Sequence, residues 1–223
     1  MKTLFDISVP EFLRSLGSVA MTASEDTTRP YLNSILIRSV DGKREIVATD
    51  GHCLALWTDK GNAVDRPDFE TLLPLAFVES ILRRAKQTKG TLCGATFERE
   101  GTRVSVTLGD GTLSADEVTS VHFLPFAQVI PAPKTRNVKN PCQGTGLATT
   151  YLMRGAKMFD NAFKGQPEKR DSGVYVEFPE DVESPVVMMR EGFPLLFVVM
   201  PVRLRSARDR DESPVPAERR PKA

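Results

Sequence analysis

The sequence predicts an α+β fold in which one short unit, a helix flanked by strands, occurs three times. Three segments carry apolar residues at helical spacing, and between them the pattern changes to the alternation typical of strands. Each helical segment follows a short strand candidate and precedes about three more. The helical segments recur at intervals of roughly 70 residues. We therefore expect repeated βαβββ units with antiparallel sheets and the helices on one face.

The first helix is expected over residues 9–20, with Ser8 as its N-cap and Pro10 in its first turn, where proline needs no hydrogen-bond partner. The second is expected over 74–88, with Gly90 after its end. The third is expected over 149–163, with Thr149 as a capping candidate. In each segment the apolar residues form one stripe that can face a sheet.

The strands follow from period-two alternation and from turn residues between them. Asp41-Gly42 marks a hairpin turn in the first unit, and Gly109 to Gly111 marks another in the second. The expected strands lie at 32–37, 46–48, 53–57, 92–97, 104–108, 113–115, 174–178, 186–189 and 195–200.

One unit of this kind is too small to bury a core of its own, so two units are expected to share one. Residues 1–127 then form a complete domain, and the third unit, 145–204, has no obvious partner within the chain. Residues 128–144 contain three prolines and are expected to be an extended connector. Residues 205–223 are charged and almost free of apolar side chains, which predicts a disordered tail.

Composition limits the possible classes of protein. The chain of 223 residues is 40% hydrophobic and 26% charged, which excludes wholesale disorder, and it has no apolar run long enough to span a bilayer. The N-terminus does not resemble a signal peptide, so we expect a cytoplasmic protein without a membrane partner. Cys53, Cys93 and Cys142 form no CxxC pair, and His52 and His122 lie far apart. These features predict no metal, no cofactor and no enzymatic activity.

Three segments in the same order resemble one family. Residues 29–56 contain RPYLNSILIRSVDGKREIVATDGHCLAL, residues 123–131 contain FLPFAQVIP, and residues 197–204 contain FVVMPVRL. They are similar to the middle domain and the C-terminus of the β subunit of bacterial DNA polymerase III, the sliding clamp. The resemblance covers roughly residues 1–204 and implies the DNA-clamp fold, in which six domains form a ring with helices facing enclosed duplex DNA. The family's first domain and half of its third have no counterpart here.

The resemblance also implies an apolar cleft that binds peptides of DNA polymerases or clamp loaders. The residues placed there are Leu32, Thr49, Gly51, His52, Cys53, Leu54, Leu124, Val129, Val198, Met200, Pro201, Val202 and Arg203. Cys53 stands where the family usually has arginine, and Gln128 replaces another arginine, so we expect a cleft with fewer cations and an altered peptide preference. Plain core packing is the alternative for Val198, Met200 and Leu204. Asp50 and His52 are interpreted as turn residues rather than catalytic ones.

Basic residues outnumber acidic ones on the three helical segments, although the formal charge of the chain is +1. The candidates for phosphate contacts are Arg14, Arg83, Arg84, Lys86, Arg154 and Lys157. Such a face binds duplex DNA without sequence preference, and an ordinary solvated helix surface is the alternative. Two functions therefore stay open: a processivity factor resembling a sliding clamp, with a possible homo-oligomer, or a clamp homologue without a ring that regulates replication proteins.

Overall fold

A computed structural model describes residues 2–59, 68–87, 94–109, 111–131, 147–166, 173–178, 184–190 and 192–202. The predicted tail 205–223 and most of the predicted connector fall outside them. The helices are α1 (Val9–Ala20), α2 (Leu75–Gln87) and α3 (Thr149–Ala162), within one residue of the predicted bounds at either end. No helix in the described part of the chain is long and apolar enough to cross a membrane.

The helix ends follow the expected chemistry at α1 and depart from it at α3. The Ser8 side chain caps α1 by accepting a hydrogen bond from the backbone N–H of Glu11, and Pro10 lies in the first turn. Thr149 was predicted to cap α3, but the N-cap is Ala148, which has no side chain able to accept a bond. Thr149 instead begins the helix.

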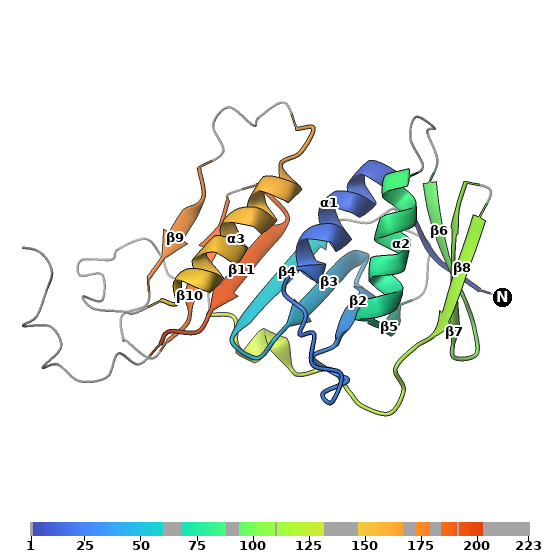
Figure 1. Ribbon diagram of the computed structural model, residues 1–223, viewed down its shortest axis with the longest axis horizontal. Coiled ribbons are helices and arrows are strands. Elements are labelled where there is room, and N and C mark those ends of the chain that lie inside the picture. The colour runs from blue at the N-terminus through green and yellow to red at the C-terminus, as the bar shows by residue number, and fades with distance from the viewer. Residues whose placement is uncertain are drawn as a thin grey trace, which may run out of the picture.

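All strand pairs are antiparallel, which confirms the predicted fold class. A four-stranded sheet has the order β1-β6-β7-β8, and a seven-stranded sheet has the order β5-β2-β3-β4-β11-β10-β9 (Figure 1). The strands are β1 (Lys2–Ser8), β2 (Ser34–Val40), β3 (Lys43–Thr49), β4 (Cys53–Asp59), β5 (Phe69–Pro74), β6 (Gly94–Glu100), β7 (Arg103–Leu108), β8 (Gly111–Asp116), β9 (Tyr175–Glu177), β10 (Val186–Met189) and β11 (Leu195–Val199).

The first two units interlock by exchanging their first strands. Strand β1 of the first unit pairs with β6 of the second, and β5 of the second pairs with β2 of the first. Helices α1 and α2 lie side by side on the same face of the molecule (Figure 1). The aromatic ring of Phe5 stacks on that of Phe97, with centroids 4.2 Å apart, so a residue from each unit meets in a common core.

The third unit does have a partner within the chain, contrary to the sequence-based expectation. Strand β11 pairs with β4 and extends the sheet of the first unit, while α3 packs beside α1. Pairing β4 with β11 satisfies backbone N–H and C=O groups that would otherwise lie on an open sheet edge. The structure describes no strand between β8 and α3, so the described part of this unit consists of α3 and three strands.

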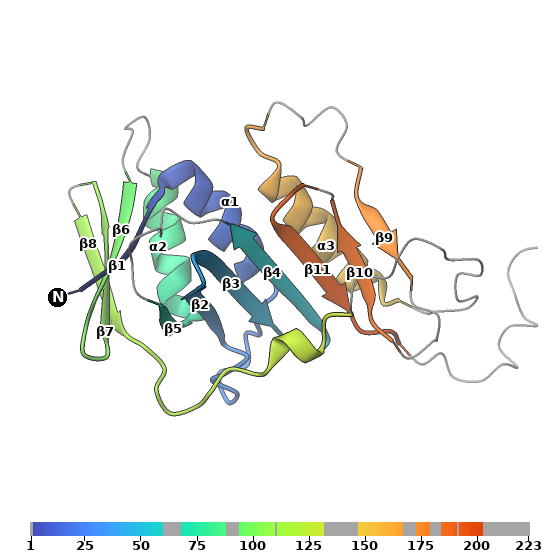
Figure 2. The same ribbon diagram turned by 180° about the vertical axis from the view of Figure 1, so that it is seen from behind.

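The seven-stranded sheet is buried on both faces at its centre. One face carries the main core beneath the helices. The opposite face carries a second core, which contains Leu36, Val47, Leu54, Leu72, Phe126 and Val198. Residues 117–131, which we call the strap, cross this face and include the short 3₁₀ helix η1 (Phe126–Gln128) (Figure 2). The strap lies between β8 and the third unit in the sequence.

Candidate functional site

The turn between β3 and β4 is held by its own side chains. Asp50 Oδ1 accepts hydrogen bonds from the backbone N–H groups of His52 and Cys53, each at 2.9 Å. Thr49 Oγ1 donates to the carbonyl oxygen of Cys53 at 2.7 Å and accepts from the N–H of Gly51 at 3.0 Å. Gly51 has a φ of 89°, a left-handed conformation that favours glycine. These contacts confirm the interpretation of the turn as a hydrogen-bonded structural element.

The end of β11 lies directly beside this turn. Val199 and Val198 pair with Cys53 and Leu54 in the sheet, and the N–H of Met200 donates to the carbonyl oxygen of His52 at 2.9 Å. The Met200 side chain is 37% exposed, whereas Val198 is buried. Two segments nearly 150 residues apart in the sequence therefore form one edge of the candidate site.

The strap supplies a third segment. Phe126 is buried against Leu54 and Val198 in the second core, while Leu124 and Val129 on either side of it are exposed. The guanidinium of Arg38 lies 4.7 Å from the centroid of the Phe126 ring. A hollow of about 310 Å³ lies here. Its lining consists of Leu36, Arg38, Glu70, Phe123, Leu124, Pro125, Phe126, Ala127 and Gln128.

The residues predicted to line the peptide cleft thus fall into two groups. The buried ones, which a partner cannot touch directly, are Leu32, Thr49, Cys53, Leu54 and Val198. Those that are at least partly exposed are Gly51, His52, Leu124, Val129, Met200, Pro201 and Val202. The alternative of plain core packing fits Val198 and does not fit Met200. Arg203 and Leu204 lie outside the described residues.

Helix α3 adds two side chains that the sequence did not assign to this site. Arg154 Nη1 lies 2.5 Å from Asp50 Oδ2 and 3.4 Å from Cys53 Sγ. The ring of Tyr151 stacks on that of His52, with centroids 5.8 Å apart and an interplanar angle of 15°. Tyr151 and Arg154 are three residues apart on a helix, so they share a face, and this spacing is the one signal of their proximity in the sequence.

The electrostatics of this corner follow from burial and hydrogen bonding. Burial opposes ionisation of Asp50, but hydrogen bonds from the backbone of Cys53 and His52 and from Arg154 outweigh it and lower the pKa of the carboxyl group. Burial, together with the charge of Asp50, raises the pKa of the Cys53 thiol to about 12. Cys53 is therefore a neutral thiol near pH 7 and lacks the thiolate that nucleophilic chemistry needs.

The predicted DNA-contacting residues differ in how far they face solvent. Arg83, Arg84, Lys86 and Lys157 are exposed. Arg14 is half-buried, and its guanidinium faces the side-chain amide of Gln166. Arg154 is directed to Asp50, so part of its charge is already balanced within the protein. Arg83, Arg84, Lys86 and Lys157 therefore present more of their side chains to solvent than Arg14 and Arg154 do.

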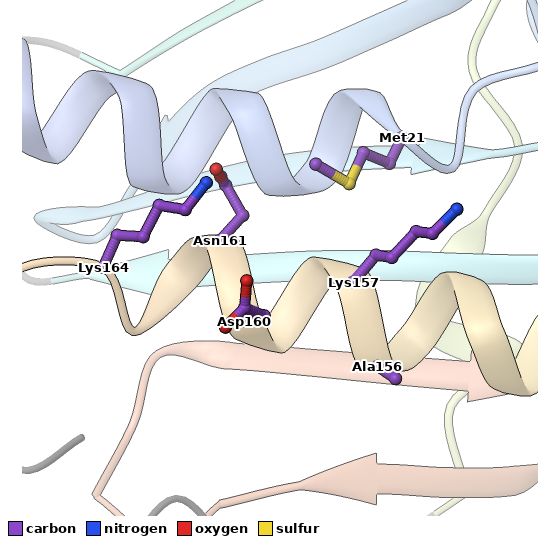
Figure 3. A pocket seen from close by; sticks show the side chains of 6 residues that line it. All are labelled: Met21, Ala156, Lys157, Asp160, Asn161 and Lys164. Atoms are coloured by element: carbon purple, nitrogen blue, oxygen red, sulfur yellow. The ribbon is translucent and has the colours of Figure 1, made fainter. Parts of the chain in front are cut away.

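An open groove of about 480 Å³ runs between α1 and α3 (Figure 3). It is lined by Met21, Ala156, Lys157, Asp160, Asn161 and Lys164. The amide nitrogen of Asn161 donates to the carbonyl oxygen of Leu13 at 3.1 Å and to Ser18 Oγ at 3.0 Å, which joins the two helices beneath the groove. Lys157 and Lys164 stand at its two ends. The described residues include no cluster of three potential metal ligands.

No protein-family model matches the chain. The chain is 25% identical over 127 residues to the beta sliding clamp of Rickettsia bellii (strain RML369-C). This alignment covers 57% of the chain and 33% of the relative, so the chain matches about a third of that protein's length.

Solved structures match a larger part of the chain. The DNA polymerase sliding clamp of Pseudomonas aeruginosa aligns with a TM-score of 0.70 and 16% identity, over 90% of this chain and 66% of the other. The sliding clamp of Bacillus subtilis aligns with a TM-score of 0.72 and 12% identity, over 90% and 64%. A putative DNA polymerase III beta subunit of Eubacterium rectale aligns with a TM-score of 0.72 and 8% identity, over 92% of this chain and 66% of the other.

The structural matches show the DNA-clamp fold, and the curated relative links the sequence itself to the same proteins. Both results agree with the resemblance found in the three segments of the sequence. The chain thus has the DNA-clamp fold and is similar in sequence to a bacterial beta sliding clamp over 57% of its length.

Proposed function

We propose that the chain acts as a processivity factor resembling a sliding clamp, which binds duplex DNA through basic helices and partner peptides through an apolar cleft. One observation carries the proposal: the β3–β4 turn, the end of β11 and the strap meet at one place. These segments carry the exposed apolar residues Leu124, Val129 and Met200 beside the buried Leu54, Phe126 and Val198. A soluble partner segment can bury its own apolar side chains at such a place.

The exposed apolar side chains of these segments can serve as contacts for a short peptide. Leu124, Val129, Met200 and Val202 are each roughly 40% exposed and lie in the segments that meet there. Burying one large apolar side chain of a partner stabilises a complex by roughly 1.5–3 kcal/mol. Two such anchors with a few backbone hydrogen bonds, less the cost of ordering the peptide, give a Kd on the order of micromolar.

The peptide hypothesis is tested by fluorescence anisotropy with a labelled nonapeptide that carries leucine and phenylalanine anchors. Met200→Asp should abolish binding, because an unpaired carboxylate in the cleft is costly to desolvate. Val176→Asp is the matched control, since Val176 is also an exposed apolar residue but lies on β9. Equal binding by the wild type and Met200→Asp, or no binding by the wild type up to millimolar peptide, would remove the cleft from the proposal.

The DNA hypothesis depends on the exposed cations of α2 and α3. Contacts to phosphates make affinity independent of sequence and steeply dependent on salt, with log K falling by about 0.9 per phosphate contact for each tenfold rise in salt. Reversing Arg83, Arg84, Lys86 and Lys157 to glutamate should abolish binding to a 30-base-pair duplex at low salt. Reversal of Lys2, Arg29, Lys43 and Arg103, which are exposed and lie outside the helices, changes the net charge by the same amount and is the control. If the helix variant binds the duplex as tightly as the wild type, these four residues form an ordinary solvated surface and make no DNA contacts.

A second function, an interaction module that forms no ring, is favoured by one feature of the fold. The turn, the strap and the end of β11 all belong to one chain, so a cleft can form without a second copy. A ring, by contrast, needs a homo-oligomer. Light scattering after size-exclusion chromatography, with and without a primed circular DNA, separates the two. A monomer under both conditions supports the interaction module, and an oligomer that stays on the circle supports the processivity factor.

A further inference from the structure

The two sheets end in four edge strands, and these edges differ in how open they are. Strand β1 carries a register shift between Thr3 and Phe5, an irregularity that disfavours further pairing. The N–H of Val118 in the strap donates to the carbonyl oxygen of Leu72 at 2.8 Å and covers part of the β5 edge. Strand β9 is three residues long. Strand β8 has six residues in unbroken register with β7 and lies at the outer end of its sheet (Figure 1, Figure 2).

The backbone groups that β8 presents at this edge follow from its pairing with β7. Hydrogen-bonded and non-hydrogen-bonded positions alternate along an antiparallel ladder. The N–H of Glu117 donates to the carbonyl oxygen of Thr102 at 2.8 Å, so the non-hydrogen-bonded positions are Asp116, Ser114 and Thr112. The backbone N–H and C=O groups of these three residues therefore point away from β7. Within the described residues, no other strand pairs with them.

The side chains of β8 leave this edge without protection. Leu113 and Ala115 pack against the main core, to which α2 also contributes. Thr112, Ser114 and Asp116 are exposed on the opposite face. The strand contains no lysine, no proline and no bulge, the features that commonly keep an exposed edge from pairing. Strand β8 is therefore a regular edge that can accept a further strand.

We propose that β8 is a self-association edge, at which a second copy of this chain adds its own β8 in antiparallel orientation. The strand is complementary to itself about Ser114. In that register Thr112 lies opposite Asp116 of the partner subunit, so that the hydroxyl donates to the carboxylate. Leu113 lies opposite the partner's Ala115, so that a large side chain meets a small one. The outward residues of the two copies exchange about six backbone hydrogen bonds.

The proposed contact joins two four-stranded sheets into one continuous sheet and stops at a dimer, because a two-fold contact is closed. The axis between two antiparallel strands is perpendicular to the sheet, so both copies of α2 lie on the same face. Arg83, Arg84 and Lys86 of the two copies then share one surface and contact duplex DNA at two places. This last consequence rests on the proposed function. The dimer itself needs neither DNA nor the peptide cleft.

Light scattering after size-exclusion chromatography without DNA tests the dimer over loading concentrations of about 5 to about 500 μM, the range in which a small interface associates. The mass of the wild type should rise from 24.7 kDa toward twice that value. Ser114→Pro should stay monomeric, because proline lacks the N–H that the second copy needs, and that N–H makes no bond to β7. Ser114→Ala keeps the N–H and is the matched control, with a dissociation constant within about fivefold of the wild-type value. Circular dichroism establishes that each variant is folded.

Cysteine cross-linking tests the register independently of the proline variant. Cys93 and Cys142 are replaced by serine, whereas Cys53 is buried and is kept. Ser114→Cys should form a disulfide-linked dimer on mild oxidation, because directly opposed Cα atoms lie about 5.5 Å apart, within the range of a disulfide. Thr112→Cys is the matched control. Its counterpart in the second copy lies four residues along the strand, about 13 Å away, so it should not cross-link.

Three results would overturn the inference. The first is a wild type that stays monomeric up to about 500 μM, together with no cross-linking of Ser114→Cys. The second is a folded Ser114→Pro that dimerises as the wild type does. The third is a Thr112→Cys variant that cross-links as readily as Ser114→Cys. A monomeric wild type leaves the cleft and the DNA hypothesis in place, and failure of peptide or DNA binding leaves the dimer in place.

Discussion

Replacing Phe197 with alanine tests whether the third unit is an integral part of the fold. Phe197 lies on β11, is 0% exposed and belongs to the main core that β4, α1 and α3 share. Its ring lies so close to α3 that a Cβ atom at Gly155 would come within 2.8 Å of it. Truncation would therefore leave a cavity between α3 and the sheet.

The cost follows from the size of this cavity. Phe→Ala substitutions at fully buried positions lower the free energy of unfolding by about 3–5 kcal/mol. The neighbouring Met188 can move into part of the space, which favours the lower end of that range. For a chain of this size, a loss of 3–5 kcal/mol lowers Tm by roughly 6–20 °C. The affinity for the peptide should fall in parallel, because β11 forms one edge of the proposed cleft.

The assay is urea unfolding followed by circular dichroism and by the fluorescence of Trp57, a residue of β4 outside the third unit. If the third unit and the first share one core, both signals should shift together in a single transition. Phe178→Ala is the matched control: this phenylalanine follows β9 and is 41% exposed, so its loss should change stability by less than about 0.5 kcal/mol. A Trp57 transition that stays at the wild-type position would refute the shared core.

Three further outcomes are expected. Gly155→Val should lower the free energy of unfolding by about 1–3 kcal/mol, because the new side chain overlaps the Phe197 ring, and a variant as stable in urea as the wild type would contradict this contact. Asn161→Ala should lower the free energy of unfolding by about 1 kcal/mol, since the Asn161 amide no longer donates hydrogen bonds to α1. Thermal unfolding measures this change, and an unchanged Tm would contradict a stabilising role for these bonds. Because the pKa of Asp50 is lowered in the folded state, the wild type should be more stable than Asp50→Asn above pH 3.8, by on the order of 1 kcal/mol. This difference in the free energy of unfolding should disappear as the pH falls through the folded-state pKa, which lies below 3.8. Urea midpoints at pH 7 and pH 3 measure the difference, and a gap that widens in acid would show the sign to be wrong.

Local features of this fold could be predicted from the sequence because their causes are local. The stripe of Phe12 and Leu16, with Ser8 and Pro10 before it, determines where α1 begins and which face it buries. The positive φ of Gly51 and the hydrogen bonds of Asp50 depend on neighbours within three residues. This turn lies within residues 29–56, one of the three segments that resemble sliding clamps, so the resemblance could be recognised from local sequence.

Only the tertiary structure decided which strands and charges meet. The alternation in β4 and β11 predicts two strands, but their pairing depends on which open edge the whole chain can cover, and nothing local encodes that choice. The same holds for the exchange of β1 and β5 between units. Arg154 on a helix surface looks like any solvated cation until the docking of α3 brings it to Asp50. Sequence periodicity determines the elements and their buried faces, because those depend on neighbours in the chain. The composition of the site depends on contacts between residues about 100 positions apart, and packing alone selects them.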